Sequence, residues 1–194
     1  MRIIKLISEE TIKKNDIIAK ITLVNEKAKA IVECLYDYNS EYLAYFHDYN
    51  ASEIREIIEE NRANKTRNIF PMLQPLKGET GVYLFFNSEN IPIYVGVGGI
   101  GKNDDLYVRV RNECKIHSES YSEDTGATLS INIKKELELL NQYKDDNQIK
   151  SLINSFRIIA INLGKMNVSS NQDFANYLES LLIILFRPQY NRRG

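Results

Sequence analysis

Hydrophobic and polar residues follow two different periods along this chain, and the period changes near residue 78. Residues 81–86 and 91–95 place successive apolar side chains on opposite faces, which is typical of β-strands. Residues 87–90, with the sequence Asn-Ser-Glu-Asn, are polar and favour a turn. The pattern therefore predicts a β-hairpin closed by a four-residue loop.

The hairpin register decides which side chains share a face of the sheet. If Phe86 faces Ile91 across the loop, Tyr83 lies directly opposite Tyr94. Two phenols on one surface are either a cross-strand packing pair or a pair of groups available for chemistry. The hairpin alone leaves both interpretations open.

Three helices and one more strand are predicted after the hairpin. Apolar residues at intervals of three and four predict helices over residues 105–117, 129–143 and 169–185. The β-branched run 156–161 predicts a third, buried strand. Pro188 ends the last helix.

The part of the chain before residue 78 has a mainly helical pattern. Apolar side chains recur at helical spacing in residues 30–46 and again in residues 51–60, where Asn50-Ala51-Ser52-Glu53 resembles a capping box. Pro71 and Pro75 indicate a connector. We therefore predict a mainly helical region over residues 1–77, a candidate for gripping a substrate, and a second domain over residues 78–194.

The composition is typical of a globular protein. Hydrophobic residues make up 43% and charged residues 26% of the chain, and no apolar run is long enough to cross a bilayer. The first residues do not resemble a secretory signal, so we expect a cytoplasmic protein with no membrane partner. Cys34 and Cys114 provide neither a disulfide framework nor a metal site and are expected to be reduced packing residues.

The net charge of −1 counts against a typical nucleic-acid-binding protein, which has a basic excess. Basic residues are nevertheless unevenly distributed. One group follows the hairpin and consists of Lys102, Arg109, Arg111, Lys115 and His117. A second group near the C-terminus consists of Arg187, Arg192 and Arg193. The first group forms either a local basic face or a set of solvated charges without a partner.

One carboxylate interrupts the apolar pattern of the last predicted helix. Glu179 lies within Tyr177-Leu178-Glu179-Ser180-Leu181-Leu182. Burying a carboxylate is costly unless it is paired or holds a cation. Glu179 therefore either points to solvent beside Ser180 or binds a cation.

Together these features resemble the GIY-YIG nuclease family. The resemblance covers residues 81–191 and rests on Gly81-Val82-Tyr83, Tyr94-Val95-Gly96, an arginine in the next helix, Glu179 and Arg187-Pro188-Gln189-Tyr190-Asn191. It implies an α+β fold with a small three-stranded antiparallel sheet flanked by helices. It also implies a DNA endonuclease of the restriction or mobile-element kind, which hydrolyses phosphodiester bonds.

The resemblance implies a role for each of five residues. Glu179 holds one Mg²⁺ or Mn²⁺ ion per active site, and the metal stabilises the leaving oxygen. Tyr83, polarised or deprotonated, takes a proton from the attacking water, while Tyr94 orients that water or the phosphate. Arg109 places a positive charge beside the phosphate, and Asn191 ties the C-terminal segment to the wall of the site.

DNA is the partner that the resemblance implies. The residues expected to contact the DNA are Lys102, Arg111, Lys115 and His117. Cutting both strands with one site per chain requires two copies or sequential nicking, so a homodimer is one of two expectations.

The chain departs from the family at one position. Many members have a histidine four residues after the helix arginine, where this chain has Glu113. Glu113 also stands four residues after Arg109, so a surface ion pair is the interpretation without chemistry, and Arg111 is then the phosphate contact. The missing histidine leaves the general base open.

Two other functions are compatible with the sequence. Residues 96–103 nearly match a phosphate-binding P-loop, but Asn103 replaces the Ser or Thr that would hold Mg²⁺, so a nucleotide-binding protein is a remote alternative. A nearer alternative is a nucleic-acid-binding or regulatory relative that has lost activity, which the net charge and Glu113 favour.

Overall fold

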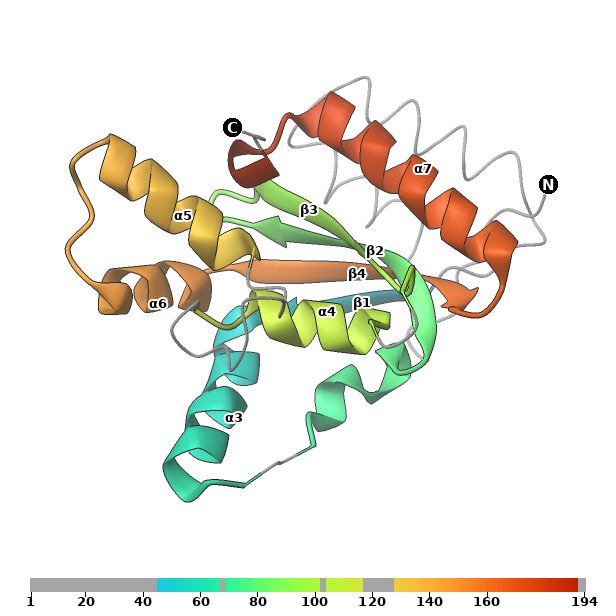
Figure 1. Ribbon diagram of the computed structural model, residues 1–194, viewed down its shortest axis with the longest axis horizontal. Helices are drawn as coiled ribbons and strands as arrows, with labels where there is room; N and C mark the ends of the chain where they lie inside the picture. The colour runs from blue at the N-terminus through green and yellow to red at the C-terminus, as the bar shows by residue number, and fades with distance from the viewer. Residues whose placement is uncertain (1–44, 67–68, 102–103, 117–127, 192–194) are drawn as a thin grey trace.

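The structure, a computed structural model, describes residues 45–66, 69–101, 104–116 and 128–191 (Figure 1). The fold of these residues is α+β, with a four-stranded antiparallel sheet flanked by helices. The strands are β1 (Tyr45–Asn50), β2 (Glu79–Phe86), β3 (Pro92–Gly98) and β4 (Arg157–Lys165). They lie in the order β1-β4-β2-β3, so β1 and β3 form the two edges.

Five α-helices and two 3-10 helices complete the described part of the fold. The α-helices are α3 (Ala51–Asn64), α4 (Leu106–Glu113), α5 (Thr128–Leu139), α6 (Asp146–Asn154) and α7 (Ser169–Phe186). The 3-10 helices are η1 (Pro71–Leu76) and η3 (Gln189–Asn191). None of the helices in the described part of the chain is long and apolar enough to span a membrane.

The sheet has one strand more than the three that the resemblance implied. The additional strand, β1, lies in the region expected to be mainly helical and pairs with β4 along its whole length. Its six residues gain their β conformation from a partner far along the chain, so no local pattern predicts them. The division at residue 77 stays a prediction, although β1 and α3 share a core with the residues that follow.

The three helices predicted after the hairpin are present; α4 and α5 are shorter than predicted, and α7 ends one residue later than predicted. Asp105 caps α4 by accepting a hydrogen bond from the Val108 amide, and the helix ends at Glu113 rather than near residue 117. Helix α6 was not predicted, although it has two recognisable signals. Asp145 caps its first turn, and two buried isoleucines four residues apart form its apolar face.

Different helices cover the two faces of the sheet (Figure 1). One face packs against α7 in a cluster of Val82, Leu84, Phe86, Val95, Ile159, Ile161, Ala175, Leu178 and Leu182. Tyr83, Phe85 and Tyr94 lie on the opposite face, which packs against α3, α4, α5 and α6. The alternation expected for β2 is therefore confirmed.

The hairpin register differs from the expected one by two residues. Tyr83 lies opposite Gly96, and Tyr94 lies opposite Phe85. Because side chains alternate with a period of two, the shift keeps both phenols on one face but makes them diagonal neighbours.

Two local features cause this shift. The loop is one residue shorter than expected, because Asn87 rather than Phe86 pairs with Ile91. The Asn87 amide donates to the Ile91 carbonyl oxygen over 3.0 Å, and the Asn87 side chain accepts from the Ile91 amide over 2.9 Å. A β-bulge then inserts Ile93 between the partners of Phe85 and Phe86. Each feature moves the register by one residue.

Candidate active site

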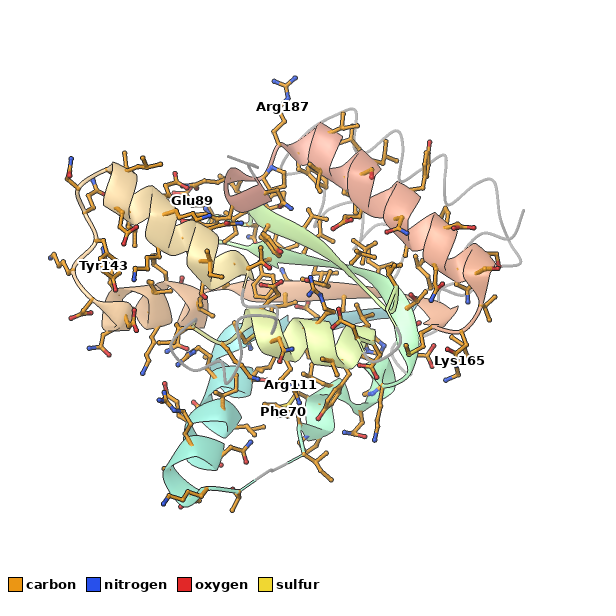
Figure 2. The ribbon with its side chains drawn as sticks, viewed as in Figure 1. Phe70, Glu89, Arg111, Tyr143, Lys165 and Arg187 are labelled. Atoms are coloured by element: carbon orange, nitrogen blue, oxygen red, sulfur yellow. The ribbon has the colours of Figure 1, made fainter. Side chains whose placement is uncertain are left out.

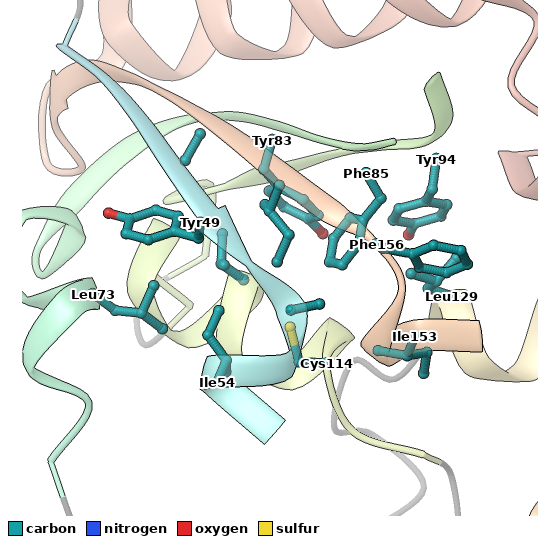
Figure 3. Close-up of a cluster of buried hydrophobic side chains, with 14 of the residues drawn as sticks. Tyr49, Ile54, Leu73, Tyr83, Phe85, Tyr94, Cys114, Leu129, Ile153 and Phe156 are labelled. Atoms are coloured by element: carbon teal, nitrogen blue, oxygen red, sulfur yellow. The ribbon is translucent and has the colours of Figure 1, made fainter. Parts of the chain in front are cut away.

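Two tyrosine hydroxyls meet at one carboxylate in the interior. The Oη atoms of Tyr83 on β2 and Tyr94 on β3 each donate to Oε1 of Glu113 on α4, and both distances are 3.2 Å. The exposed fraction is 0% for Tyr83, 5% for Tyr94 and 0% for Glu113. Figure 3 shows the two tyrosine rings on the same side of the sheet as Phe85, and the ring centroids of Tyr83 and Tyr94 are 6.3 Å apart.

A glycine in β3 makes room for the Tyr83 ring. A Cβ atom on Gly96 would lie 2.3 Å from the Tyr83 Oη atom and 2.4 Å from its Cζ atom. The ring therefore crosses β3 directly over the position where any other residue would have a side chain. The glycine of Tyr94-Val95-Gly96 is thus required by the packing of the tyrosine of Gly81-Val82-Tyr83.

We expect the Gly96→Ala variant to be destabilised by about 2 kcal/mol, because the added methyl group must displace a ring that is buried on all sides. Urea unfolding of both proteins measures this difference in the free energy of unfolding. Gly101→Ala is the matched control, since a Cβ there would have its nearest neighbour at 3.8 Å. Equal stability of the Gly96→Ala variant and the wild type would show that the Tyr83 ring is not held over β3.

Glu113 is the acceptor at the centre of the cluster. Its second oxygen, Oε2, accepts from the Leu129 amide over 2.8 Å, at the N-terminal end of α5. The Arg109 Nη2 atom lies 3.7 Å from Oε1. The ion pair expected between Arg109 and Glu113 is therefore present. The prediction that it lies at the surface is wrong, because Glu113 is completely buried.

The environment changes the acidity of all three groups in the cluster. Burial raises the pKa of the Glu113 carboxyl to about 7, although the Leu129 amide and Arg109 act in the opposite direction. Burial also raises the pKa of Tyr83 and of Tyr94 above the ordinary value. A deprotonated Tyr83, one of the two forms expected from the sequence, is therefore disfavoured, and both phenols are neutral donors.

Arg109 adds a positive charge at the border of the cluster. Its guanidinium is 23% exposed and lies between Glu113 and Asp104, with an Nη1 to Oδ2 distance of 3.5 Å to Asp104. Among the described residues its buried Nε atom has no hydrogen-bond partner. Both ion pairs are longer than strong charge-assisted hydrogen bonds, so the guanidinium retains donor capacity for an anionic ligand.

Asn191 forms the hydrogen bonds expected of it. Its Oδ1 atom accepts from the Val95 amide over 2.7 Å, and its Nδ2 atom donates to the Val95 carbonyl oxygen over 2.6 Å. These backbone groups belong to β3, which is an edge strand of the sheet among the described residues. Asn191 therefore ties η3 to the edge of the sheet, beside Tyr94.

Glu179 is not part of the tyrosine cluster. It is half-buried on α7, which covers the opposite face of the sheet and buries its neighbour Leu178. Helices α4 and α7 both contact β3, and a Cβ on Gly98 would lie 3.3 Å from the Arg109 Cγ atom. Helices α4 and α7 therefore both pack on β3, and each covers a different face of the sheet.

The described residues contain no group of three or more His, Cys, Asp or Glu side chains that could hold a metal ion. The carboxylate oxygens of Glu179 suit a hard cation such as Mg²⁺, which keeps several water ligands and needs few protein ligands. At Glu179 such an ion would take its other ligands from water and from a substrate phosphate.

Arg111 points to a different part of α4 from Arg109. Arg109 and Arg111 are two positions apart on the helix, so their side chains point in nearly opposite directions. The Arg111 guanidinium lies 5.9 Å from the centroid of the Tyr107 ring and donates to Asn112 Oδ1 over 3.1 Å. It is therefore not the arginine of the tyrosine cluster.

The basic face expected from the sequence is only partly described. Lys115 is half-buried directly after α4, whereas Lys102 and His117 lie outside the described residues. Arg187 is exposed at the C-terminal end of α7, away from Arg111 (Figure 2). The contacts of these residues with DNA stay predictions.

A backbone hydrogen bond joins the beginning of the glycine-rich run after β3 to the residues just before α4. The Gly99 amide donates to the Asp104 carbonyl oxygen over 2.6 Å. The Asp105 carboxylate accepts from the Val108 amide over 2.8 Å and from the Gly78 amide over 2.7 Å. A carboxylate thus occupies the helix N-terminus, where a P-loop would bind phosphate.

The role of Glu113 as a shared acceptor was not predicted. A signal was present, because Leu106, Val110 and Glu113 follow one another at intervals of four and three residues on the buried stripe of α4. A carboxylate on such a stripe requires buried donors. Cys114, expected to be a packing residue, is a buried free thiol.

Comparison of the chain with protein-family models, with curated proteins and with solved structures finds no match. The residues of the cluster and their geometry are therefore the basis for an inference about function.

Proposed function

We propose that this protein is a metal-dependent phosphodiester hydrolase. In this proposal it is an endonuclease of the GIY-YIG type, and its substrate is DNA. The observation that carries the proposal is the cluster in which Tyr83, Tyr94 and Arg109, taken from three separate elements, gather around one buried carboxylate.

Arg109 supplies the positive charge that phosphodiester hydrolysis requires. Negative charge builds up on the phosphate oxygens as the water attacks, and a fixed guanidinium beside them stabilises that charge. Its planar set of donors suits a phosphate better than the ammonium of lysine. The unpartnered Nε–H and the long ion pairs support this role.

The tyrosines bind and orient the attacking water. Both hydroxyl protons are directed at Glu113, so each phenol oxygen acts as an acceptor toward other groups, and Tyr94 already has a hydrogen bond with the Thr128 side chain beside any bond to water. Tyr94 is the less enclosed of the two and is the better candidate for this contact.

Glu179 would hold one Mg²⁺ or Mn²⁺ ion at the edge of β3. When bound, such an ion stabilises negative charge on the leaving oxygen. Asn191 holds η3 against β3 and so keeps the wall of the site in position on this edge.

DNA as the substrate follows from the resemblance, as do the restriction or mobile-element role and the cytoplasmic location. A homodimer and sequential nicking by a monomer are the two ways in which one site per chain cuts both strands.

The second candidate function is nucleic-acid binding without hydrolysis. The observation that favours it is the burial of the cluster, since Tyr83 and Glu113 are not exposed at all. A substrate reaches these groups only if α4 or the edge of β3 moves. Without such a movement, the protein would bind nucleic acid but not cleave it.

Cleavage of supercoiled plasmid DNA separates the two candidates. We expect the wild type to nick the plasmid with Mg²⁺ or Mn²⁺ and to be inactive in EDTA. Arg109→Lys should lower the rate on the order of 100-fold, because lysine lacks the planar fork. Arg62→Lys, the same change at an exposed residue of α3, is the control and should leave the rate within twofold. If the wild type binds DNA but cuts neither plasmid nor genomic DNA with either metal, the non-hydrolytic function is the correct one.

A further inference from the structure

Glu113 is a carboxylate at a position where an apolar packing residue is expected. It is fully buried and lies on the same stripe of α4 as two apolar residues, Leu106 and Val110. Its two oxygens accept three hydrogen bonds, and two of the three donors are tyrosine hydroxyls. An apolar residue of similar volume would avoid the cost of burying the carboxylate, so its presence calls for a chemical reason.

We propose that Glu113 is the proton acceptor of the hydrolysis and acts through the hydroxyl of Tyr94. This inference rests on the proposed function. It assigns the general base that the sequence leaves open.

The attacking water forms a bond to phosphorus, and one of its O–H bonds breaks as its proton moves to the Tyr94 Oη atom. The original Tyr94 proton moves along its hydrogen bond to Glu113 Oε1. The bond between phosphorus and the leaving oxygen breaks, and that oxygen takes a proton from solvent. Glu113 returns its proton to solvent by the reverse path after the product leaves.

Geometry favours the carboxylate over the phenols as the final acceptor. The two phenols share the same acceptor atom, so a charge left on either oxygen would stand beside the carboxylate. On Glu113 the added proton instead neutralises a buried charge. The raised pKa of Glu113, about 7, also lets it exchange a proton near neutral pH.

The groups that face Glu113 come from four elements, and a cation from a fifth contacts the next residue. Tyr83 and Tyr94 approach from the sheet, Arg109 from the preceding turn of α4, and the Leu129 amide from α5. From α3, Arg55 donates to the carbonyl oxygen of Cys114, the residue after Glu113, over 2.9 Å. Of these groups, the Leu129 amide, Arg109 and the two tyrosine hydroxyls favour the charged form of the buried carboxylate.

The test is the pH dependence of single-turnover plasmid nicking by the wild type, Glu113→Gln and Glu113→His. We expect the wild-type rate to rise about tenfold per pH unit up to the titration of Glu113 and then to level off. Glu113→Gln should lose this rise and be slower by about 100-fold or more at pH 8. Glu113→His, which restores a group that titrates near neutrality, should recover about tenfold over Glu113→Gln.

Glu138→Gln is the matched control, because this exposed residue of α5 lies outside the cluster. Circular dichroism checks the fold of each variant, and if Glu113→Gln does not fold, Glu113→His decides. Carboxyl infrared difference spectra, the wild type against a Glu113 variant, follow the titration of Glu113 without reference to activity.

Four results are decisive. Loss of the pH rise in Glu113→Gln, or its shift to the titration of imidazole in Glu113→His, supports the proton acceptor. An unchanged pH rise in the folded variant overturns the inference and leaves the proposed function intact. A uniform loss of rate with the wild-type pH profile shows a structural role and also overturns it. A wild type that nicks no DNA at any pH removes the proposed function and the inference together, even where the infrared titration of Glu113 is seen.

Discussion

Glu179→Gln is expected to slow metal-dependent DNA nicking by about 1000-fold or more, the largest effect of any single substitution considered. Glutamine keeps the size of the side chain but removes the charge that holds a divalent cation, and loss of the cation removes its stabilisation of the leaving oxygen. The rate is measured with supercoiled plasmid over a range of Mg²⁺ and Mn²⁺ concentrations. A partial recovery at high Mn²⁺ would further indicate weakened metal binding.

Asp173→Asn is the control for this substitution. It removes one negative charge from the same helix at an exposed position, and it should leave both the rate and the metal dependence unchanged. Glu179 lies on the helix that covers the face opposite the tyrosines, so the result also tests whether the site spans the edge of β3. A Glu179→Gln variant that nicks within tenfold of the wild-type rate would mean that Glu179 does not hold the metal ion.

The second large effect concerns stability and its dependence on pH. Burial raises the pKa of Glu113 from the ordinary value of 4.5 to about 7. Between these two values the folded protein retains the Glu113 proton and the unfolded chain has lost it. The folded state therefore binds more protons, and the free energy of unfolding must fall as the pH rises through this range. The total contribution is about 3 kcal/mol, with the protein less stable above pH 7 than below pH 4.5.

Urea unfolding of the wild type and Glu113→Gln at pH 5 and pH 8 measures this contribution. Glutamine does not titrate, so the difference in the free energy of unfolding between the two proteins should change by about 2.5 kcal/mol in favour of the variant between pH 5 and pH 8. Other groups, including His47, whose pKa is lowered by burial, are present in both proteins and cancel in the comparison. A difference that stays constant with pH would show that Glu113 titrates normally and is not a buried carboxylate.

The effect of Glu113 on stability bears on its role in the site. A carboxylate at Glu113 reduces stability at neutral pH, and glutamine would avoid that cost. Groups that lower stability in this way are characteristic of functional positions rather than of structural ones.

The faces and order of the elements after residue 78 could be predicted because they depend on local patterns. Alternation in β2 separates Val82 from Tyr83, and helical spacing places α4, α5 and α7. The fourth strand could not be predicted in this way. β1 is stabilised by β4, which follows it only after more than half of the chain, and its own six residues carry too little signal.

The candidate site shows the same limit. The residue types that suggested phosphodiester chemistry, Tyr83, Tyr94, Arg109, Glu179 and Asn191, are visible in the sequence. Their relations are not, because a one-residue change in the hairpin loop and a bulge at Ile93 move the register by two residues.

What the sequence by itself determined was therefore the hairpin, the strand β4, the helices α4, α5 and α7, and the chemical groups that these elements carry. Only the tertiary structure decided that the two phenols share the carboxylate of Glu113 and that Glu179 lies on the other side of the sheet. The physical reason is that side-chain periodicity is a property of each segment, whereas burial, hydrogen-bond partners and acidity depend on segments that meet only when the sheet and its helices pack together.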